Sequence, residues 1–187
     1  MLASCSDDGA VILWSSADGC RLRELSGSGH AVCSLSFSRD GSRLATGSWD
    51  KLVRVWDLRP DGAAAGAPPD GDGGAALVGH ESSVTCVRFS PCGARLASAA
   101  WDATLRLWDP AARRPATPGP LRGHTGCVRV VGWNRGGGAV ASGGDDGAVR
   151  LWDAGTGQPL GPAWEGHAGQ VLPLGLALLA VTRHDLP

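Results

Sequence analysis

The sequence predicts an all-β fold in which one short antiparallel unit is repeated along the chain. The first observation is a segment of similar sequence that occurs four times and ends each time in Trp, at residues 3–14, 45–56, 97–108 and 141–152. The second is the spacing of these Trp residues, which are 42, 52 and 44 positions apart, as in repeat proteins built from strands. The third is that apolar and polar residues alternate over short runs, with no sustained helical period.

Length and composition exclude several classes of protein. The chain has 187 residues, of which 43% are hydrophobic, which suits one folded domain and argues against bulk disorder. Its 17 basic and 18 acidic residues leave a net charge of −1, which argues against a strongly basic nucleic-acid domain. The 29 Gly, 12 Pro and 8 Trp residues favour short strands joined by turns, with one aromatic residue reused at a set position.

The sequence shows no targeting or metal-binding signal. Its longest apolar run, residues 172–181, has about half the length of a transmembrane helix, and the N-terminus has no signal peptide. The six cysteines form no C-x-x-C pair, so neither a zinc ribbon nor a redox motif is indicated. We therefore expect reduced cysteines in a cytoplasmic or nuclear protein that is neither secreted nor membrane-bound, with no metal, cofactor or small-molecule substrate.

A second repeated element lies in phase with the first. Gly-His pairs occur at residues 79–80, 123–124 and 166–167, and four residues after each His a strand-like run begins. These runs are residues 84–89, 128–133 and 171–176. Turn signals, such as those at residues 38–41 and 90–93, follow the strand-like runs. Each repeat is therefore predicted to contain strands joined by tight turns.

These repeats resemble the WD40 family, and the resemblance covers nearly the whole chain. The period, the Gly-His pair and the Trp-Asp ending agree in three consecutive repeats, whereas the first repeat ends in Trp14 followed by Ser15. The resemblance implies a β-propeller, in which four-stranded antiparallel blades surround a central channel. The fold class that we predict is an all-β WD40 propeller.

The resemblance also implies a buried hydrogen-bonded chain of Trp, Ser or Thr, His and Asp in each blade. The matching positions are Ser4, Asp8, Trp14, Thr46, Asp50, Trp56, His80, Ser98, Asp102, Trp108, His124, Ser142, Asp146, Trp152 and His167. A carboxylate in a tight turn is costly to bury alone, and His and Ser supply the donors that it needs. The set recurs in every repeat, whereas a catalytic triad occurs once in a cleft. We therefore interpret it as structural and expect no enzymatic activity.

The second repeat departs from this pattern. Its first strand begins at Val32, only two residues after His30, where the other repeats leave four. Either Ser28 occupies the His position, or the loop is shorter and His30 bends inward. We predict that this blade has the weakest network.

The long step of 52 residues contains an insertion at residues 59–76 that is rich in Ala, Gly and Pro. This composition cannot bury a core, so we expect a mobile surface loop between the third and fourth strands of its blade. A ligand motif in this loop is the alternative.

The repeats divide the chain into one predicted array, residues 1–187, with five parts. These are the end of a first blade at 1–26, blades at 27–78, 79–122 and 123–165, and the start of an unfinished blade at 166–187. We therefore expect an incomplete array, with about three complete repeats and two partial ones, from a larger propeller protein.

One face of the array is a candidate interaction surface. The residues just before each turn Asp point out there, and so do the residues just after each strand-opening Val. The candidates are Trp49, Trp101, Arg129, Asp145, Asp7 and Thr85. Trp49 and Trp101 have no evident duty inside a blade, and exposed aromatic residues often anchor protein interfaces. The alternative is that each Trp leans on its neighbour and covers a loop.

The main functional hypothesis is a non-enzymatic scaffold that binds a peptide or loop of another protein on this face. The alternative is an RNA-binding role in a ribonucleoprotein. Arg54, Arg106 and Arg150 could form a phosphate-binding stripe, although they are most simply the solvent-facing residues of their strands. Residues 24–27 and 33–47 also resemble the WD40 array of the telomerase protein component.

Overall fold

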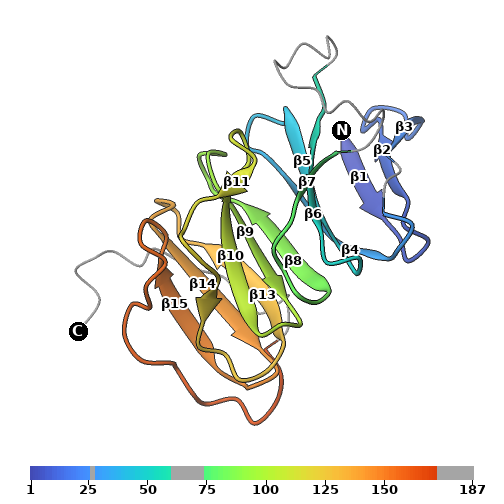
Figure 1. Cartoon of the computed structure of the whole chain (residues 1–187). Coiled ribbons are helices and arrows are strands. Elements are labelled where there is room, and N and C mark those ends of the chain that lie inside the picture. Colours follow the sequence, from blue (N-terminus) through green and yellow to red (C-terminus); the bar gives the residue numbers. More distant parts are fainter. Residues whose placement is uncertain (26–27, 60–73, 172–187) are drawn as a thin grey trace.

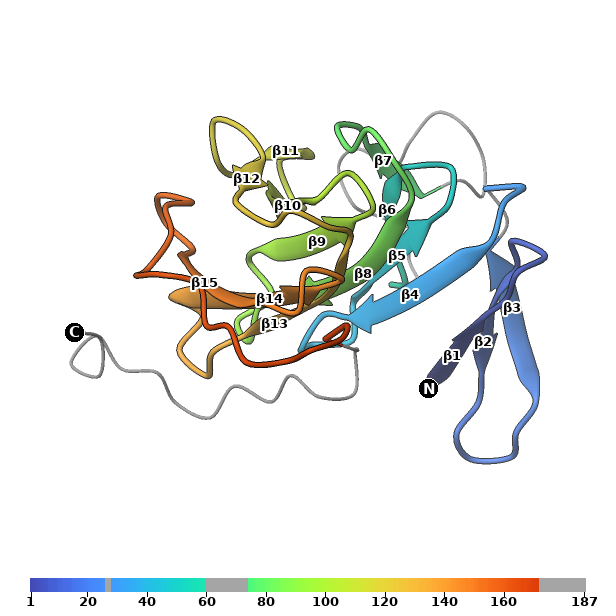
Figure 2. The same ribbon diagram turned by 90° about the horizontal axis from the view of Figure 1, so that it is seen from below.

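Antiparallel strands make up all the regular structure of the chain (Figure 1). The computed structural model describes residues 1–25, 28–59 and 74–171, which contain fifteen strands and no helix. The strands form four sheets that follow one another in chain order, and each sheet stands beside the next (Figures 1 and 2). The predicted all-β fold is confirmed, and the described sheets form an open arc consistent with part of a propeller.

The first two sheets contain the N-terminal strands in simple up-and-down order. The first sheet contains β1 (Leu2–Cys5), β2 (Val11–Trp14) and β3 (Arg21–Leu25). The second contains β4 (Val32–Phe37), β5 (Arg43–Ser48), β6 (Val53–Asp57) and β7 (Ala75–Leu77). Residues 60–73 of the expected insertion lie outside the described residues. Ala75 and Ala76, also expected in the insertion, instead belong to β7 because they pair with the free edge of β6.

The third and fourth sheets repeat the same order. The third contains β8 (Val84–Phe89), β9 (Leu96–Ala100), β10 (Thr104–Asp109) and, along the outer edge of β10, the short strands β11 (Arg114–Pro115) and β12 (Leu121–Arg122). The fourth contains β13 (Val128–Trp133), β14 (Ala139–Gly144) and β15 (Val149–Asp153). Single bridges from Trp164 and Pro159 occupy the outer edge of β15. The described residues contain no helix that is long and apolar enough to cross a membrane.

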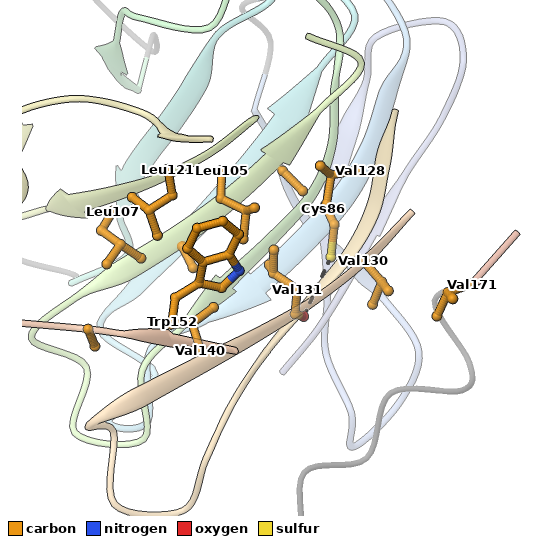
Figure 3. Close-up of a cluster of buried hydrophobic side chains, with 13 residues drawn as sticks. Cys86, Leu105, Leu107, Leu121, Val128, Val130, Val131, Val140, Trp152 and Val171 are labelled. Atoms are coloured by element: carbon orange, nitrogen blue, oxygen red, sulfur yellow. Dashed lines mark hydrogen bonds between the residues drawn. The ribbon is translucent and has the colours of Figure 1, made fainter. Parts of the chain in front are cut away.

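The hydrophobic core lies between neighbouring sheets. Figure 3 shows the layer between the third and fourth sheets, where the indole of Trp152 packs among Leu105, Leu107 and Leu121. Trp56 and Trp108 take the same place in the two preceding layers. Burial of one Trp side chain contributes roughly 4–6 kcal/mol as an upper estimate. The repeated Trp is therefore the residue that joins each sheet to the one before it.

Two glycines, Gly47 and Gly143, are in close contact with a valine from later in the chain. A Cβ built on Gly47 would lie 2.7 Å from Cγ1 of Val84, and one built on Gly143 would lie 2.4 Å from Cγ1 of Val171. Both glycines lie in the second strand of their sheet, and Val84 is the first residue of the next sheet. A larger residue at Gly47 would therefore push the second and third sheets apart.

The Asp-containing turn, which joins β1 to β2, β5 to β6, β9 to β10 and β14 to β15, has the same design in all four sheets. Its Asp accepts, at Oδ1, the backbone N–H of the residue two positions later, at 2.8–3.2 Å. These residues are Asp8, Asp50, Asp102 and Asp146. The residue that follows each Asp has positive φ, and these residues are Gly9, Lys51, Ala103 and Gly147. The side chain thus closes the turn even where a non-glycine residue occupies the left-handed position.

A β-bulge occurs at the second residue of the first strand in the last three sheets. The strand registers shift between Val32 and Ser34, between Val84 and Cys86, and between Val128 and Val130. The residues left out of the ladder are Cys33, Thr85 and Arg129. A bulge re-aims its side chain, so these three residues stand at the same end of the sheets as the Asp turns.

Candidate interaction face and the hydrogen-bond networks beneath it

A chain of four polar side chains runs through the third sheet, from the core to the Asp turn. The indole N–H of Trp108 donates to Ser98 Oγ at 2.8 Å. Ser98 Oγ lies 2.7 Å from His80 Nε2, and His80 Nδ1 lies 2.9 Å from Asp102 Oδ2. His80 comes from the loop before β8, so the chain ties that loop to β9, β10 and the turn between them.

The fourth sheet contains the same series of four hydrogen-bonded side chains. Trp152 donates to Ser142 Oγ at 2.8 Å, and Ser142 Oγ lies 2.7 Å from His124 Nε2. His124 Nδ1 lies 2.8 Å from Asp146 Oδ2, and the backbone N–H of Thr125 donates to the same carboxylate. The imidazole of His124 is fully buried.

Hydrogen-bond geometry assigns one arrangement of protons to these networks. Because the indole only donates, it occupies a lone pair of the Ser oxygen, and the Ser hydroxyl donates to Nε2 of His. Nδ1–H then donates to the carboxylate. Burial lowers the pKa of His124, although the hydrogen bond and charge of Asp146 oppose this. Each Ser hydroxyl is engaged on both sides, and this supports a structural rather than a nucleophilic role.

The Asp residues are held as carboxylates. Burial acts to raise the pKa of Asp102, but hydrogen bonds from His80 and Thr104 outweigh it and hold the pKa well below its usual range. Thr104 Oγ1 donates to Asp102 Oδ1 at 2.6 Å, and the backbone N–H of Glu81 donates to Oδ2 at 2.9 Å. A buried carboxylate with this many donors is satisfied rather than free to exchange protons with a substrate.

The first two sheets contain only part of this series of hydrogen-bonded side chains. Trp14 donates to Ser4 Oγ at 2.9 Å, and Trp56 donates to Thr46 Oγ1 at 3.1 Å. No His joins either pair within the described residues. Asp8 stays exposed and closes only its own turn. Both sheets therefore lack the bond between the core Trp pair and the turn.

Asp50, in the second sheet, has a partner that sequence reasoning missed. Arg54 Nη1 donates to Asp50 Oδ2 at 2.6 Å, and both side chains are only 11% exposed. The expectation that the arginines of the third strands face solvent is therefore wrong at Arg54, whose guanidinium folds back onto the turn. The available signal was the four-residue spacing of an acid and a base on one strand and its turn.

Neither Ser28 nor His30 hydrogen-bonds to Asp50 or Thr46. Ser28 Oγ lies 2.5 Å from the carbonyl oxygen of His30, and His30 Nδ1 lies 2.9 Å from the carbonyl oxygen of Ser28. The imidazole of His30 is exposed. The expectation that one of them fills the His position is wrong, because both side chains bind the backbone of their own shortened loop.

The predicted network of His167 stays a prediction, because the part of its repeat after Val171 lies outside the described residues. The side chain of His167 is exposed and hydrogen-bonds to no described side chain. Its carbonyl oxygen lies over Gly147 in the fourth sheet. The residues after Val171, where a further strand was expected, lie outside the described residues.

The candidate face contains a row of side chains at the Asp-turn end of the sheets. The rings of Trp49 and Trp101 are tilted against each other with centroids 5.9 Å apart. They remain 51% and 42% exposed. Each ring thus leans on the other, as one interpretation expects, while half of it faces outward.

Arg129 extends the row into the fourth sheet. Its guanidinium carbon lies 5.6 Å from the centroid of the Trp101 ring. Its Nε and Nη2 donate to the two carboxylate oxygens of Asp145, each at 2.7 Å. These hydrogen bonds lower the pKa of Asp145. We call Trp49, Trp101, Arg129 and Asp145 the rim row.

The other two candidates for the face differ from the rim row. Thr85 Oγ1 donates inward to the carbonyl oxygens of Val128 and Ala99, at 2.6 and 3.1 Å. It therefore joins the third and fourth sheets instead of facing outward. Asp7 is exposed on the first sheet's turn. Among the described residues, no group of three or more His, Cys, Asp and Glu is arranged to hold a metal ion.

Comparisons with known proteins identify the repeats. The family model of the WD domain, G-beta repeat, matches residues 19–57, 74–109 and 117–153. A ribosome biogenesis protein WDR12 homolog of Nematostella vectensis is 35% identical over 118 residues, which cover 63% of this chain and 26% of that protein. A periodic tryptophan protein 2 homolog of Schizosaccharomyces pombe is 34% identical over 107 residues, which cover 57% of this chain and 11% of that protein. The chain thus spans a small part of these relatives, and they give no support to the telomerase resemblance.

Proposed function

Since the chain belongs to the WD40-repeat family, we propose that it is a non-enzymatic scaffold that binds other proteins through its rim row. The observation that carries this proposal is the pair of half-exposed Trp rings, Trp49 and Trp101. Large aromatic residues that contact each other and still face outward offer apolar area at little entropic cost. Such residues dominate the binding energy of many protein interfaces.

The framework beneath the row supports the same role. The hydrogen-bond networks through His80 and His124 fix the loops next to the turns that contain Trp101 and Asp145. A surface held in this way changes little on binding, so a partner loses less binding energy to ordering of the surface. We propose that the hydrogen-bond networks serve to hold the row in place.

The relatives suggest the setting of this scaffold. One is named for ribosome biogenesis, so we propose that the partners include proteins of a ribosome-assembly complex and that the chain works in the nucleus. The RNA-binding alternative is less favoured because two of its three arginines are engaged. Arg54 pairs with Asp50, and the guanidinium carbon of Arg106 lies 5.9 Å from the centroid of the Trp108 ring.

The test replaces both rim Trp residues in the protein. Tagged wild-type protein and the Trp49→Ala, Trp101→Ala double variant are expressed in cells, treated with nuclease and purified. The co-purifying proteins are then quantified by mass spectrometry. We expect ribosome-assembly proteins to be depleted at least about tenfold in the double variant, as loss of hot-spot residues predicts.

A matched control uses Trp164, which is 52% exposed at the outer edge of the fourth sheet. Trp164→Ala removes an equally exposed indole and is expected to keep all partners. An unchanged partner set in the double variant would contradict the proposed face. Partners lost on nuclease treatment of the wild type would instead favour the RNA-binding alternative.

A further inference from the structure

The face repeats one arrangement at each junction between neighbouring sheets. Each junction has a turn residue on one sheet and, on the next sheet, a turn residue and a bulge residue at the same end. In chain order the three sets are Asp7, Cys33 and Trp49, then Trp49, Thr85 and Trp101, and finally Trp101, Arg129 and Asp145. Read along the face, the turn residues are acidic, aromatic, aromatic and acidic, so the two outer junctions are mirror images in chemistry.

The last junction shows what a complete arrangement contains. Arg129 places its guanidinium over the Trp101 ring and forms two hydrogen bonds with Asp145. A flat cation between an aromatic face and a carboxylate gains from both neighbours at once. At the middle junction, Thr85 turns inward, and the two Trp rings contact each other directly.

The first junction has the same outer residues, but its bulge residue is short. Cys33 occupies the bulge position, and its thiol lies 3.3 Å from the carbonyl oxygen of Val84. Burial raises the pKa of the Cys33 thiol, as does the charge of Asp7, while the side chain of Trp49 acts in the opposite direction. The backbone N–H of Val32 donates to the carbonyl oxygen of Ser6, and that of Trp49 donates to the carbonyl oxygen of Ala31, so both turns border the bulge. No cation of the described residues pairs with Asp7.

We propose that the junction of Asp7, Cys33 and Trp49 receives an arginine side chain of the partner protein. This inference rests on the proposed function, because it names the group by which the partner enters the face. The guanidinium stacks on the half-exposed Trp49 ring and hydrogen-bonds to the Asp7 carboxylate. The partner thereby supplies to the first junction what Arg129 supplies to the last.

Arginine fits this position better than lysine. The guanidinium is planar, so it can lie on an indole and present two N–H groups in a fork to one carboxylate, as Arg129 does. An ammonium group has no flat face, and it is more strongly hydrated. A peptide with lysine in place of arginine is therefore expected to bind more weakly.

The first test builds the missing cation into the protein itself. Cys33→Arg places a guanidinium at the position that corresponds to Arg129, and Asp7→Asn removes its carboxylate. Urea unfolding of both single variants and the double variant gives their coupling. We expect Asp7→Asn to raise the unfolding equilibrium constant in both backgrounds. The increase should be about twofold to fivefold larger in the Cys33→Arg background than in the wild type. Equal effects in both backgrounds would show that the junction does not hold a cation.

The second test measures binding of a named probe, the peptide acetyl-Ala-Arg-Ala-amide. Its citrulline counterpart has the same shape without the charge. We expect the arginine peptide to shift the indole N–H signal of Trp49 in NMR spectra and to bind at least about threefold more tightly than the citrulline peptide. Binding is expected to be lost in Asp7→Asn and in Cys33→Arg, where the position is already filled.

The matched control is Asp18→Asn, which makes the same change of charge in the turn between β2 and β3 of the same sheet. This variant is expected to bind the arginine peptide as the wild type does. No shift at Trp49 up to about 10 mM peptide, or equal binding of the citrulline peptide, would overturn the inference. Partner loss in the double Trp variant would then still support the proposed face, whereas an unchanged partner set would count against the face itself.

Discussion

The second and third sheets use the same turn Asp in two different ways. In the third sheet, Asp102 binds His80 from a preceding loop, and His80 continues through Ser98 to Trp108. In the second sheet, Asp50 binds Arg54, only four residues further along the chain. Both carboxylates are satisfied, but the third sheet connects a loop, two strands and a turn, while the second connects a turn to its own strand.

This difference shows that satisfying a buried charge and locking a fold are separate tasks. A local ion pair meets the electrostatic need of the carboxylate without ordering any distant segment. The His chain also meets that need, and it fixes the loop that leads into the sheet. We therefore expect the third and fourth sheets to resist local opening more than the second does.

The largest expected effect comes from removal of the third sheet's carboxylate. Asp102→Ala leaves Nδ1–H of the buried His80 without its carboxylate acceptor and also removes the acceptor of the Glu81 backbone N–H. We expect a loss of about 3–5 kcal/mol in the free energy of unfolding, measured by urea denaturation. Asp50→Ala is the matched variant in the second sheet and is expected to cost less. Equal losses would contradict the comparison.

Acid is expected to weaken the His-containing sheets next. Burial lowers the pKa of His124, so the unfolded chain takes up protons before the folded state as pH falls through about 6.5. The stability present at higher pH therefore decreases as pH falls through this range. Although burial acts to raise it, hydrogen bonds from Thr125 and His124 hold the pKa of Asp146 below its usual value, which adds a second loss at lower pH.

Urea unfolding at a series of pH values between 7 and 4 measures this dependence. His124→Gln cannot be protonated, so it should flatten the part of the curve between pH 7 and 5 even if it lowers stability throughout. A wild-type slope that persists unchanged in this variant would show that another group is responsible.

The smallest effect is expected in the second sheet. Arg54→Ala removes the partner of Asp50 but leaves the backbone donor of its turn, and both side chains have some access to water. We expect a loss of about 1–2 kcal/mol, between the values typical of surface and buried ion pairs. His30→Ala is the control and should cost less than about 0.5 kcal/mol, since surface substitutions usually do. A larger loss for His30→Ala would mean that His30 supports this sheet after all.

The repeated features of the fold were predictable because they depend on residue type at fixed spacing. One such set recurs at the same spacing in the next repeat, and the structure joins its members by hydrogen bonds: His80, Ser98, Asp102 and Trp108. Departures from the repeat were not predictable in the same way. The pairing of Arg54 with Asp50 depends on how a side chain turns back over its own strand, and no periodic pattern records that direction.

The candidate face was predictable only in part. Position in the repeat indicated that Trp49 and Trp101 lie at one end of the sheets, and their exposure agrees with this. The contact between the two rings and the pairing of Arg129 with Asp145 depend on how neighbouring sheets are spaced. The inward turn of Thr85 depends on which backbone carbonyl lies within its reach. Such choices are made by packing, and the sequence alone does not contain the distances.

The bulges allow side chains on the candidate face to change while the backbone pairing of the strands stays the same. Cys33, Thr85 and Arg129 are left out of the strand ladders, so their side chains can be exchanged without loss of a ladder position. A substitution at one of these sites therefore leaves the ladder intact, and its cost in folding is limited to the contacts of that side chain, such as the hydrogen bond from Thr85 to Val128. Cys33, whose thiol makes a weak hydrogen bond to the carbonyl oxygen of Val84, is the site where a new side chain could change the binding preference at the least cost.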